Sequence, residues 1–318
     1  MTVVIAGASG FMGRRLAAER RRAGEEVRTI GRLGADAAWG DTAAITRLLD
    51  GADLLVNLAG RSVNCRYTAS NRAEILRSRT ETTEELGRAA AAAASPPPLW
   101  INSSTATIYR HADDRPQTEG GGELGEGFSV EVAKAWERAF LAPDLPGVRR
   151  VALRTAIVLG RGSVMVPLTR LTRVGLGGPQ LDGPWPGTPA RIAAGVHHRY
   201  RPTSSGGRQR FSWVHLDDAV RAIDFVRRRE DLDGVLNLAA PEASTNRELM
   251  AELRRALGVP VGLPASRWML ELGSLAIRTE TELVLKSRWV VPERLLAAGF
   301  TFQHTDLGET LRSILRRP

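Results

Sequence analysis

The chain has 318 residues, of which 43% are apolar and 25% charged, a composition typical of a soluble globular protein. This length supports a large core, in one large domain or two smaller ones. No apolar run is long enough to cross a bilayer, and the first predicted strand begins almost at Met1, so we expect no membrane span and no signal peptide. The single cysteine, Cys65, excludes an internal disulfide framework and favours a reducing, cytoplasmic location.

The net charge of +9 raises the question of nucleic-acid binding. Of the 44 basic residues only Lys134 and Lys286 are lysines, and the arginines are scattered along the chain. Two arginine clusters, at residues 20–22 and 227–229, close predicted helices, where cations meet the negative end of the helix dipole. No aromatic-rich or helix-turn-helix motif accompanies them, so we predict no nucleic-acid partner.

The chain begins with an apolar run at residues 3–6, glycines at positions 7, 10 and 13, and then a helical apolar pattern. This order predicts a strand, a tight turn and a helix. Gly7 permits the sharp turn, Gly10 leaves room for a pyrophosphate, and Gly13 lets the helix pack closely on the strand. The free N–H groups of the first helical turn then face the phosphates. We therefore predict a dinucleotide site rather than an ordinary glycine-rich turn.

The second predicted strand, residues 26–32, indicates which dinucleotide is bound. NAD sites usually have an acidic residue at the end of this strand, which takes the ribose hydroxyls. This chain has Arg32 there and Arg14 beside the glycine turn, and a guanidinium suits the 2′-phosphate of NADP. We therefore predict NADP(H) as the cofactor. The alternative is that both arginines are merely solvated.

Strands and helices alternate further along the chain. The patterns predict helices at residues 41–49, 70–94 and 128–141, and strands at residues 52–60, 99–103 and 148–154. The stretch at 52–60 runs into a turn of small residues, which in a doubly wound sheet lies over the cofactor. This order predicts an α/β fold with a Rossmann-type, doubly wound parallel sheet.

Nine stretches together carry a family resemblance: GASGFMG (7–13), GADLLVNLAG (51–60), SRTETT (78–83), SSTATIY (103–109), ALRTAIVLG (152–160), GLGG (175–178), GRQRFSWVHLDD (207–218), LNLAAPEASTNRE (236–248) and SRWVVPERLLAAGFTF (287–302). The chain resembles the extended short-chain dehydrogenase/reductases, in particular the atypical, epimerase-like branch with an additional C-terminal domain of unknown function. The resemblance implies an NADP-binding domain at residues 1–160 plus part of 207–240. It also implies a smaller substrate domain at residues 161–206 and 241–318.

The usual catalytic pair of that superfamily is absent. Its reductases polarise a carbonyl with a Ser or Thr and protonate it with a Tyr, whose pKa is lowered by a Lys four residues on. Aligned on Glu137, the family helix has Ser129 at the tyrosine position and Ala133 at the lysine position. Lys134 is one residue off, about 100° around the helix. Either another donor acts or no proton is transferred.

The resemblance leaves three candidate catalytic residues. Thr105 matches the catalytic hydroxyl of the family, and Tyr109, four residues later, donates a proton if its side chain points inwards. The alternative for Tyr109 is a packed loop aromatic. Arg79 occupies a position where extended members usually have asparagine, and a guanidinium there would bind a carboxylate or phosphate. The alternative for Arg79 is a surface helix arginine.

The same resemblance assigns Gln209 and His215 to the substrate side, although His215 has an equally ordinary role as a structural hydrogen-bonding residue. Residues 180–205, which include Tyr200, form an insertion relative to the family. We predict that this insertion is a lid or a partner-contacting arm; the alternative is a disordered basic loop. His197 and His198 lie within it, but adjacent histidines point apart and no other metal ligands accompany them, so we predict no metal site.

The sequence thus predicts an NADP(H)-dependent oxidoreductase acting on a small polar or secondary-metabolite carbonyl, with no nucleic acid or membrane as partner. The alternatives are an epimerase or isomerase with a tightly bound cofactor, and a non-catalytic NADPH-binding protein. The oligomeric state is left open. The predicted cofactor-binding residues are Gly7, Ser9, Gly10, Phe11, Met12, Gly13, Arg32, Leu58, Ala59, Gly60, Ser103, Thr155 and Ile157.

Overall fold

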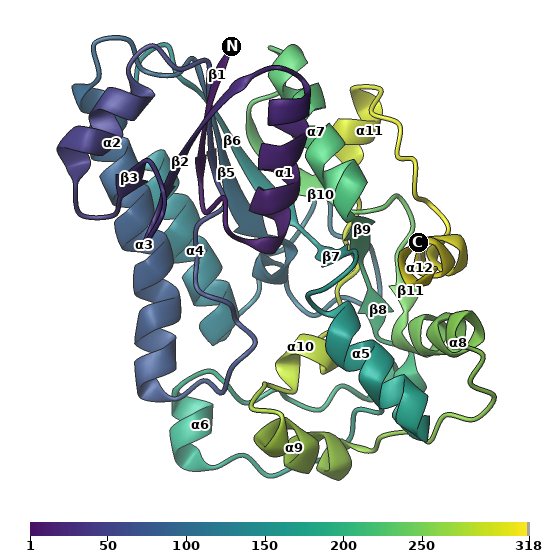
Figure 1. Cartoon of the computed structure of the whole chain (residues 1–318). Coiled ribbons are helices and arrows are strands. Elements are labelled where there is room, and N and C mark those ends of the chain that lie inside the picture. Colours follow the sequence, from purple (N-terminus) through teal and green to yellow (C-terminus); the bar gives the residue numbers. More distant parts are fainter. Residues whose placement is uncertain (317–318) are drawn as a thin grey trace.

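The structure, a computed structural model, describes residues 1–316 and is built on a seven-stranded parallel sheet (Figure 1). The strand order is β10-β6-β5-β4-β1-β2-β3. The strands are β1 (Thr2–Ala6), β2 (Glu26–Gly31), β3 (Ala37–Ala38), β4 (Leu54–Asn57), β5 (Leu99–Thr105), β6 (Arg149–Thr155) and β10 (Gly234–Leu238). Because β1 and β4 are neighbours, the chain reverses its direction of travel across the sheet there, which opens a crevice at their carboxyl ends. The predicted fold class is confirmed.

Helices cover both faces of this sheet (Figure 1). On one face α1 (Phe11–Arg22) packs beside α7 (Leu216–Arg228). On the other lie α2 (Thr42–Leu49), α3 (Ala69–Ala92) and α4 (Phe128–Leu141). The central strands β1 and β4 are buried on both faces, which explains why they consist of continuous apolar runs rather than alternating ones.

Local sequence sets the ends of several helices. The Asp41 side chain accepts the Ala44 N–H and starts α2, and the Thr68 hydroxyl accepts the Asn71 N–H and starts α3. In α8 (Asn246–Leu257), Thr245 and Glu248 form a reciprocal capping box. The predicted bounds of the helix at 128–141 agree with α4, whereas the two-residue strand β3 was not predicted.

The later part of the chain adds a group of short elements at the carboxyl edge of the sheet (Figure 1). β7 (Ile157–Leu159) pairs with β9 (Trp213–His215), and β8 (Arg210–Phe211) pairs with β11 (Ser244–Thr245). An apolar cluster that includes Trp213, Leu249 and Leu311 forms their core. The remaining elements are η1 (Ala106–Ile108), α5 (Met165–Leu171), η2 (Thr172–Leu176), α6 (Pro189–Ala193), η3 (Pro202–Gly207), α9 (Arg267–Ala276), α10 (Glu282–Leu285), α11 (Glu293–Ala297) and α12 (Leu307–Leu315).

The insertion at residues 180–205 is held to α9 by buried charges. The Asp182 carboxylate, fully buried, accepts hydrogen bonds from the Arg267 guanidinium at 2.7 Å and from the His198 ring at 3.1 Å. Arg191 donates to the Glu280 carboxylate at 2.6 Å. The insertion is therefore packed as part of the fold, unlike the disordered loop considered as the alternative.

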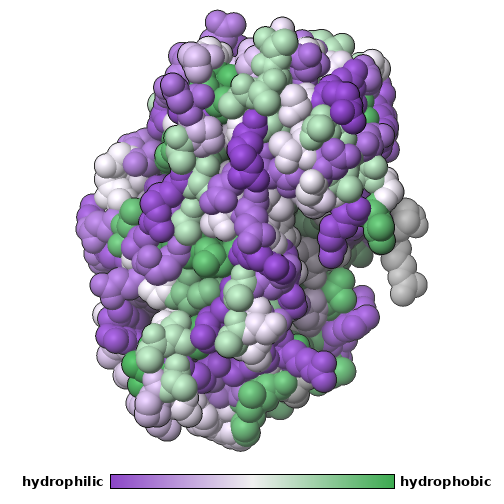
Figure 2. Space-filling model, turned by 90° about the vertical axis from the view of Figure 1, so that its left-hand side faces the viewer, coloured by the Kyte–Doolittle hydropathy of each residue, from purple (hydrophilic) through white to green (hydrophobic). Residues whose placement is uncertain are grey.

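Figure 2 shows the face that carries α2 and α3, seen from the left-hand side of Figure 1. Hydrophilic residues are spread over the whole of this face, with apolar residues between them in small patches. Within residues 1–316, no helix combines the length and the hydropathy that a membrane span requires.

Candidate active site

The glycine turn after β1 leaves no room for side chains. Gly7 has a φ of +80°, a conformation that residues with a Cβ rarely adopt, and a Cβ there would lie 2.8 Å from the Ala59 backbone nitrogen. A Cβ on Gly13 would lie 2.3 Å from the Gly7 carbonyl oxygen. The glycine turn is therefore in direct backbone contact with the start of α1 and with the turn after β4. A cradle for a dinucleotide requires such close contacts.

The N-terminus of α1 is open. Gly10 occupies its N-cap position without a side-chain hydrogen bond, and Ser9 and Gly10 are exposed. The first N–H groups of α1 are therefore free to bind an anion. The Phe11 ring packs closely against Gly160, where a Cβ would lie 2.9 Å from it, and this contact fixes the end of the helix. Met12 packs against the core. The arrangement fits a pyrophosphate.

Arginines line the end of the crevice beyond β2. Arg32 directly follows that strand, is exposed, and forms no ion pair with the residues that the structure describes. The first acidic residue after it, Asp36, turns back and accepts hydrogen bonds from the Thr29 N–H and hydroxyl at 2.7 and 2.8 Å. Arg14 donates to the Ser9 carbonyl at the glycine turn. The Asp36 carboxylate is thus engaged by Thr29, whereas the Arg32 guanidinium is exposed and suits a phosphate.

A buried amide network holds the turn at Leu58, Ala59 and Gly60. The Asn57 side chain accepts the Ala59 N–H at 3.0 Å and donates to Asn102 at 2.7 Å. The sequence analysis did not single out this pair, although a polar residue at the end of an apolar strand is a usable signal.

The carboxyl ends of β5 and β6 bring Ser103, Thr105 and Thr155 to the same edge of the sheet. Thr105 and Thr155 are directly paired across the two strands, and both are half-buried. The Thr105 hydroxyl accepts the Thr107 N–H at 3.2 Å, and Ile157 begins β7 just beyond. The predicted catalytic hydroxyl and the predicted nicotinamide residues therefore lie together.

Tyr109 differs from the expected proton donor. Its ring is 1% exposed in a buried cluster, and its hydroxyl donates to Asn237 at 2.8 Å and accepts from Arg154 at 3.0 Å. Burial raises the pKa of this phenol. Tyr109 is thus packed in the loop, which was the alternative to a proton donor. Its hydroxyl is held by Asn237, which lies 128 residues away in the chain.

Arg79 lies between the turn after β4 and helix α4. Its guanidinium stands 5.1 Å from the centre of the Trp136 ring and donates to the Ile75 carbonyl at 2.9 Å. A Cβ on Gly60 would lie 3.2 Å from it. Burial lowers the pKa of the guanidinium to about 10, and it forms no ion pair within residues 1–316. A desolvated cation without a counterion, beside the cofactor turn, is suited to binding an anion.

A segment at residues 282–288 reaches the same edge from the C-terminal part of the chain. Lys286 Nζ donates to the Thr107 carbonyl at 2.7 Å, and Arg288 Nε donates to the Thr107 hydroxyl at 3.2 Å. The Glu282 carboxylate accepts the Ser129 hydroxyl at 2.8 Å. Sequence reasoning assigned no site residue in this segment, because Lys286 is 179 residues from Thr107 and lies just before the family stretch that begins at Ser287.

Gln209, which was predicted to lie on the substrate side, lines a small buried pocket. It is 1% exposed, and its Nε2 donates to the Gln180 carbonyl at 2.9 Å, while Oε1 has no partner among the described residues. Gln209 lines a narrow pocket together with Ile157 and Lys286, with room for about one water molecule. Tyr200, by contrast, is 39% exposed on the insertion.

Comparison with known proteins agrees with this geometry. Residues 3–125 match the NAD-dependent epimerase/dehydratase family, and residues 265–314 match a domain of unknown function, DUF1731. The chain is 32% identical to epimerase family protein SDR39U1 of Bos taurus, over 99% of this chain and 100% of that protein. It is also 32% identical to epimerase family protein ML0860 of Mycobacterium leprae, over 99% and 96%.

The chain belongs to the NAD-dependent epimerase/dehydratase family. A solved structure of the human epimerase family protein SDR39U1 with NADPH superposes with a TM-score of 0.82, at 28% identity and 99% coverage of both chains. That relative was crystallised with NADPH, the cofactor form that carries a 2′-phosphate. A guanidinium such as that of Arg32 suits this phosphate. A nicotinamide cofactor is therefore supported for this family member.

The match to DUF1731 gives the segment at residues 282–288 a place in the family architecture. Lys286 and Arg288 both lie within that matched region, at residues 265–314. In this epimerase-family member the region therefore contributes side chains to the cleft, in addition to packing against the sheet.

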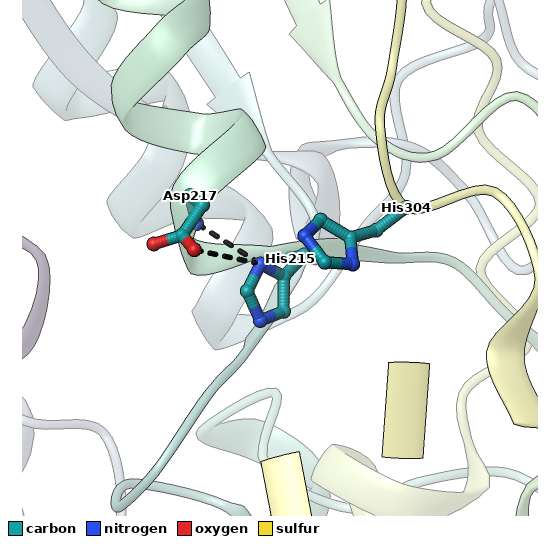
Figure 3. A group of neighbouring side chains, drawn as sticks. All are labelled: His215, Asp217 and His304. Carbon is teal, nitrogen blue, oxygen red and sulfur yellow. Dashed lines mark hydrogen bonds and ion pairs between the residues drawn. The ribbon is translucent and has the colours of Figure 1, made fainter. Parts of the chain in front are cut away.

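His215 forms a cluster with Asp217 and His304, drawn in Figure 3. His215 Nδ1 accepts the Asp217 N–H at 3.2 Å and so caps α7, and its ring stacks on that of His304 with centroids 3.7 Å apart. The two rings are tilted by 35° to each other. His215 Nδ1 already accepts the Asp217 N–H, and the Asp217 carboxylate is paired with Arg15, so these contacts serve helix capping.

Proposed function

We propose that this epimerase-family member is an NADP(H)-dependent oxidoreductase that acts on the carbonyl of a small polar or secondary-metabolite compound. The choice of NADP(H) over NAD rests mainly on Arg32, which follows β2 and forms no ion pair among the described residues. Asp36 does not pair with it and instead accepts a hydrogen bond from Thr29. The human relative solved with NADPH adds support. Its partner in this proposal is a small molecule, and the setting is cytoplasmic.

In this proposal the chain holds NADPH along the crevice at the carboxyl ends of β1 and β4. The N–H groups at the start of α1 bind the pyrophosphate, and Arg32 binds the 2′-phosphate. Bound NADPH supplies the hydride. The Thr105 hydroxyl orients the substrate carbonyl, and Arg79 binds an anionic group of the substrate.

An epimerase that retains its cofactor is the second candidate. The replacement of the usual Tyr and Lys of α4 by Ser129 and Ala133 instead favours the third candidate, a non-catalytic NADPH-binding protein, because an epimerase also has to move a proton. The relatives are named epimerase family proteins, which agrees with either reaction.

The first experiment is to record the ultraviolet absorbance and the nicotinamide fluorescence of the purified protein. NADPH oxidation is then followed against a panel of ketones, imines and nucleotide sugars. We expect bound NADPH and its net consumption with at least one panel member. Tight NADPH that is never consumed would favour the epimerase, or a non-catalytic NADPH-binding protein.

Arg32→Asp tests the cofactor assignment separately. We expect the preference for NADP over NAD to fall by about 100-fold, because one guanidinium–phosphate pair is lost and a carboxylate now suits the ribose hydroxyls. Equilibrium binding of NADPH and NADH is the measurement, with Arg22→Asp at the exposed end of α1 as the matched charge control. An unchanged preference would show that Arg32 does not bind the 2′-phosphate.

A further inference from the structure

The C-terminal segment at residues 282–288 contacts both places where the superfamily keeps its catalytic groups. Glu282 accepts a hydrogen bond from Ser129, the residue at the position of the missing tyrosine. Lys286 and Arg288 bind the turn at Thr107, two residues beyond the catalytic hydroxyl of Thr105. A segment remote in sequence therefore contacts the residue at the missing tyrosine position and the turn after Thr105.

The pocket beside Lys286 has the size and polarity to hold one oxygen atom. Ile157, at the predicted nicotinamide position, lines it together with Lys286 and Gln209. Gln209 is nearly fully buried, and its Oε1 is an acceptor without a donor among the described residues. An unpartnered buried acceptor is costly, so it points to a ligand hydroxyl or a water molecule that donates to it.

We propose that Lys286 is the proton donor of this site and that the pocket between Lys286 and Gln209 receives the carbonyl oxygen of the substrate. This inference rests on the proposed function, because it requires a nicotinamide beside Ile157.

The step balances as a reduction. A hydride from NADPH forms a bond to the carbonyl carbon, and a proton from the Lys286 ammonium forms a bond to the carbonyl oxygen. The carbonyl is reduced to an alcohol, NADPH is oxidised to NADP⁺, and Lys286 becomes a neutral amine that regains a proton from water. The new hydroxyl then donates its hydrogen to Gln209 Oε1, which was without a donor.

Lys286 is better suited to this role than the other polar groups nearby. Burial lowers the pKa of its ammonium to about 8, with Arg288 acting in the same direction and Glu282 opposing it. A group with a pKa near working pH donates and recovers a proton efficiently. Arg288 keeps its proton, and burial raises the pKa of the phenol of Tyr67.

The presence of only two lysines makes a direct test possible. Isotope-labelled lysine gives two side-chain NMR signals, and Lys134→Arg identifies the one from Lys286. The pKa of Lys286 is measured in the NADPH complex and in the NADP⁺ complex. The oxidised nicotinamide carries an extra positive charge, so we expect the pKa of Lys286 to be about one unit lower with NADP⁺. Lys134, half-buried on α4 and paired with Glu131, serves as the internal reference.

Each outcome of this titration is decisive. An equal pKa of Lys286 in the two complexes would overturn the inference. The proposed cofactor would still stand in that case, because the titration requires that NADPH binds. If neither cofactor binds, the proposed function fails first. A shift of Lys286 alone supports the inference without any knowledge of the substrate.

Turnover gives a second, independent readout. Lys286→Arg keeps the positive charge and a donor for the Thr107 carbonyl but gives up no proton at neutral pH. With a panel substrate that wild type reduces, we expect kcat to fall by at least about 100-fold and the basic limb of its pH profile to disappear. Lys134→Arg should retain wild-type kcat. An Arg variant with normal kcat and an unchanged pH profile would assign Lys286 a structural role only.

Discussion

The two ends of the cleft are built in different ways. The proposed cofactor end consists of consecutive residues from Gly7 to Gly13, whose backbone atoms would be the binding groups. At the substrate end, side chains from distant segments make the site, as when Lys286 meets Thr107 across 179 residues. The first end depends on the absence of side chains, whereas the second depends on their identity and on long-range packing.

This difference predicts opposite sensitivities. The cofactor end should be disrupted by any added atom at a contact glycine. The substrate end should be disrupted by the loss of a single buried charge, because such a charge leaves its partner unpaired in an apolar surrounding. The following predictions test the comparison in decreasing order of expected effect.

Asp182→Ala should cause the largest loss of stability. It leaves the Arg267 guanidinium, which the Asp182 carboxylate binds at 2.7 Å, buried without that partner. Because Arg267 keeps its pair with Glu271 at 2.8 Å, we expect the free energy of unfolding to fall by about 2–3 kcal/mol, less than for a buried charge left without any partner. Urea denaturation measures this change. The control is Asp231→Ala, which breaks the exposed pair with Arg229 and should cost less than about 1 kcal/mol. Equal losses in the two variants would contradict the buried anchor.

Gly13→Ala should have the next largest effect and act on the cofactor end. Its Cβ would lie 2.3 Å from the Gly7 carbonyl oxygen, so α1 must move away from the turn. We expect a loss of about 1–3 kcal/mol of stability and loss of NADPH binding. Thermal unfolding and cofactor fluorescence measure the two effects. Gly273→Ala is the matched control, since a Cβ there meets nothing within 4 Å. Unchanged NADPH affinity in Gly13→Ala would contradict the comparison, because the cofactor end would then tolerate an added atom.

The smallest effect concerns pH and the pair of His215 and His304. Burial first, and then His304, lowers the pKa of His215 below its ordinary value of 6.5. The folded state therefore favours the neutral ring, so this stabilisation is present above about pH 6.5 and is lost as the pH falls. We expect the free energy of unfolding, measured from pH 7.5 to 5.5, to fall less steeply in His304→Gln. A steeper fall in His304→Gln than in wild type would show that His304 does not lower the pKa of His215.

The sequence predicted most of the fold because the decisive signals are local. The glycine spacing, the alternating strands and helices, and the helix at 128–141 each depend on residues close in the chain. Thr105 and Arg79 were predicted from motifs on single elements, and their roles stay predictions. Lys286 was missed and Tyr109 was left between two roles for one reason, which is that their hydrogen-bond partners lie 179 and 128 residues away. No local pattern records such contacts.

The position of β10 at the edge of the sheet also matters while the chain is being made. β10 pairs with β6, Gly234 lying opposite Val151, so it leaves the ribosome long after its partner strand. At about 5–20 residues per second, the interval is on the order of several seconds. During that time β6 presents an unpaired edge, a template for association with another chain. Newly made chains are therefore exposed to association through this edge after residue 155 has emerged and before residue 238 has done so.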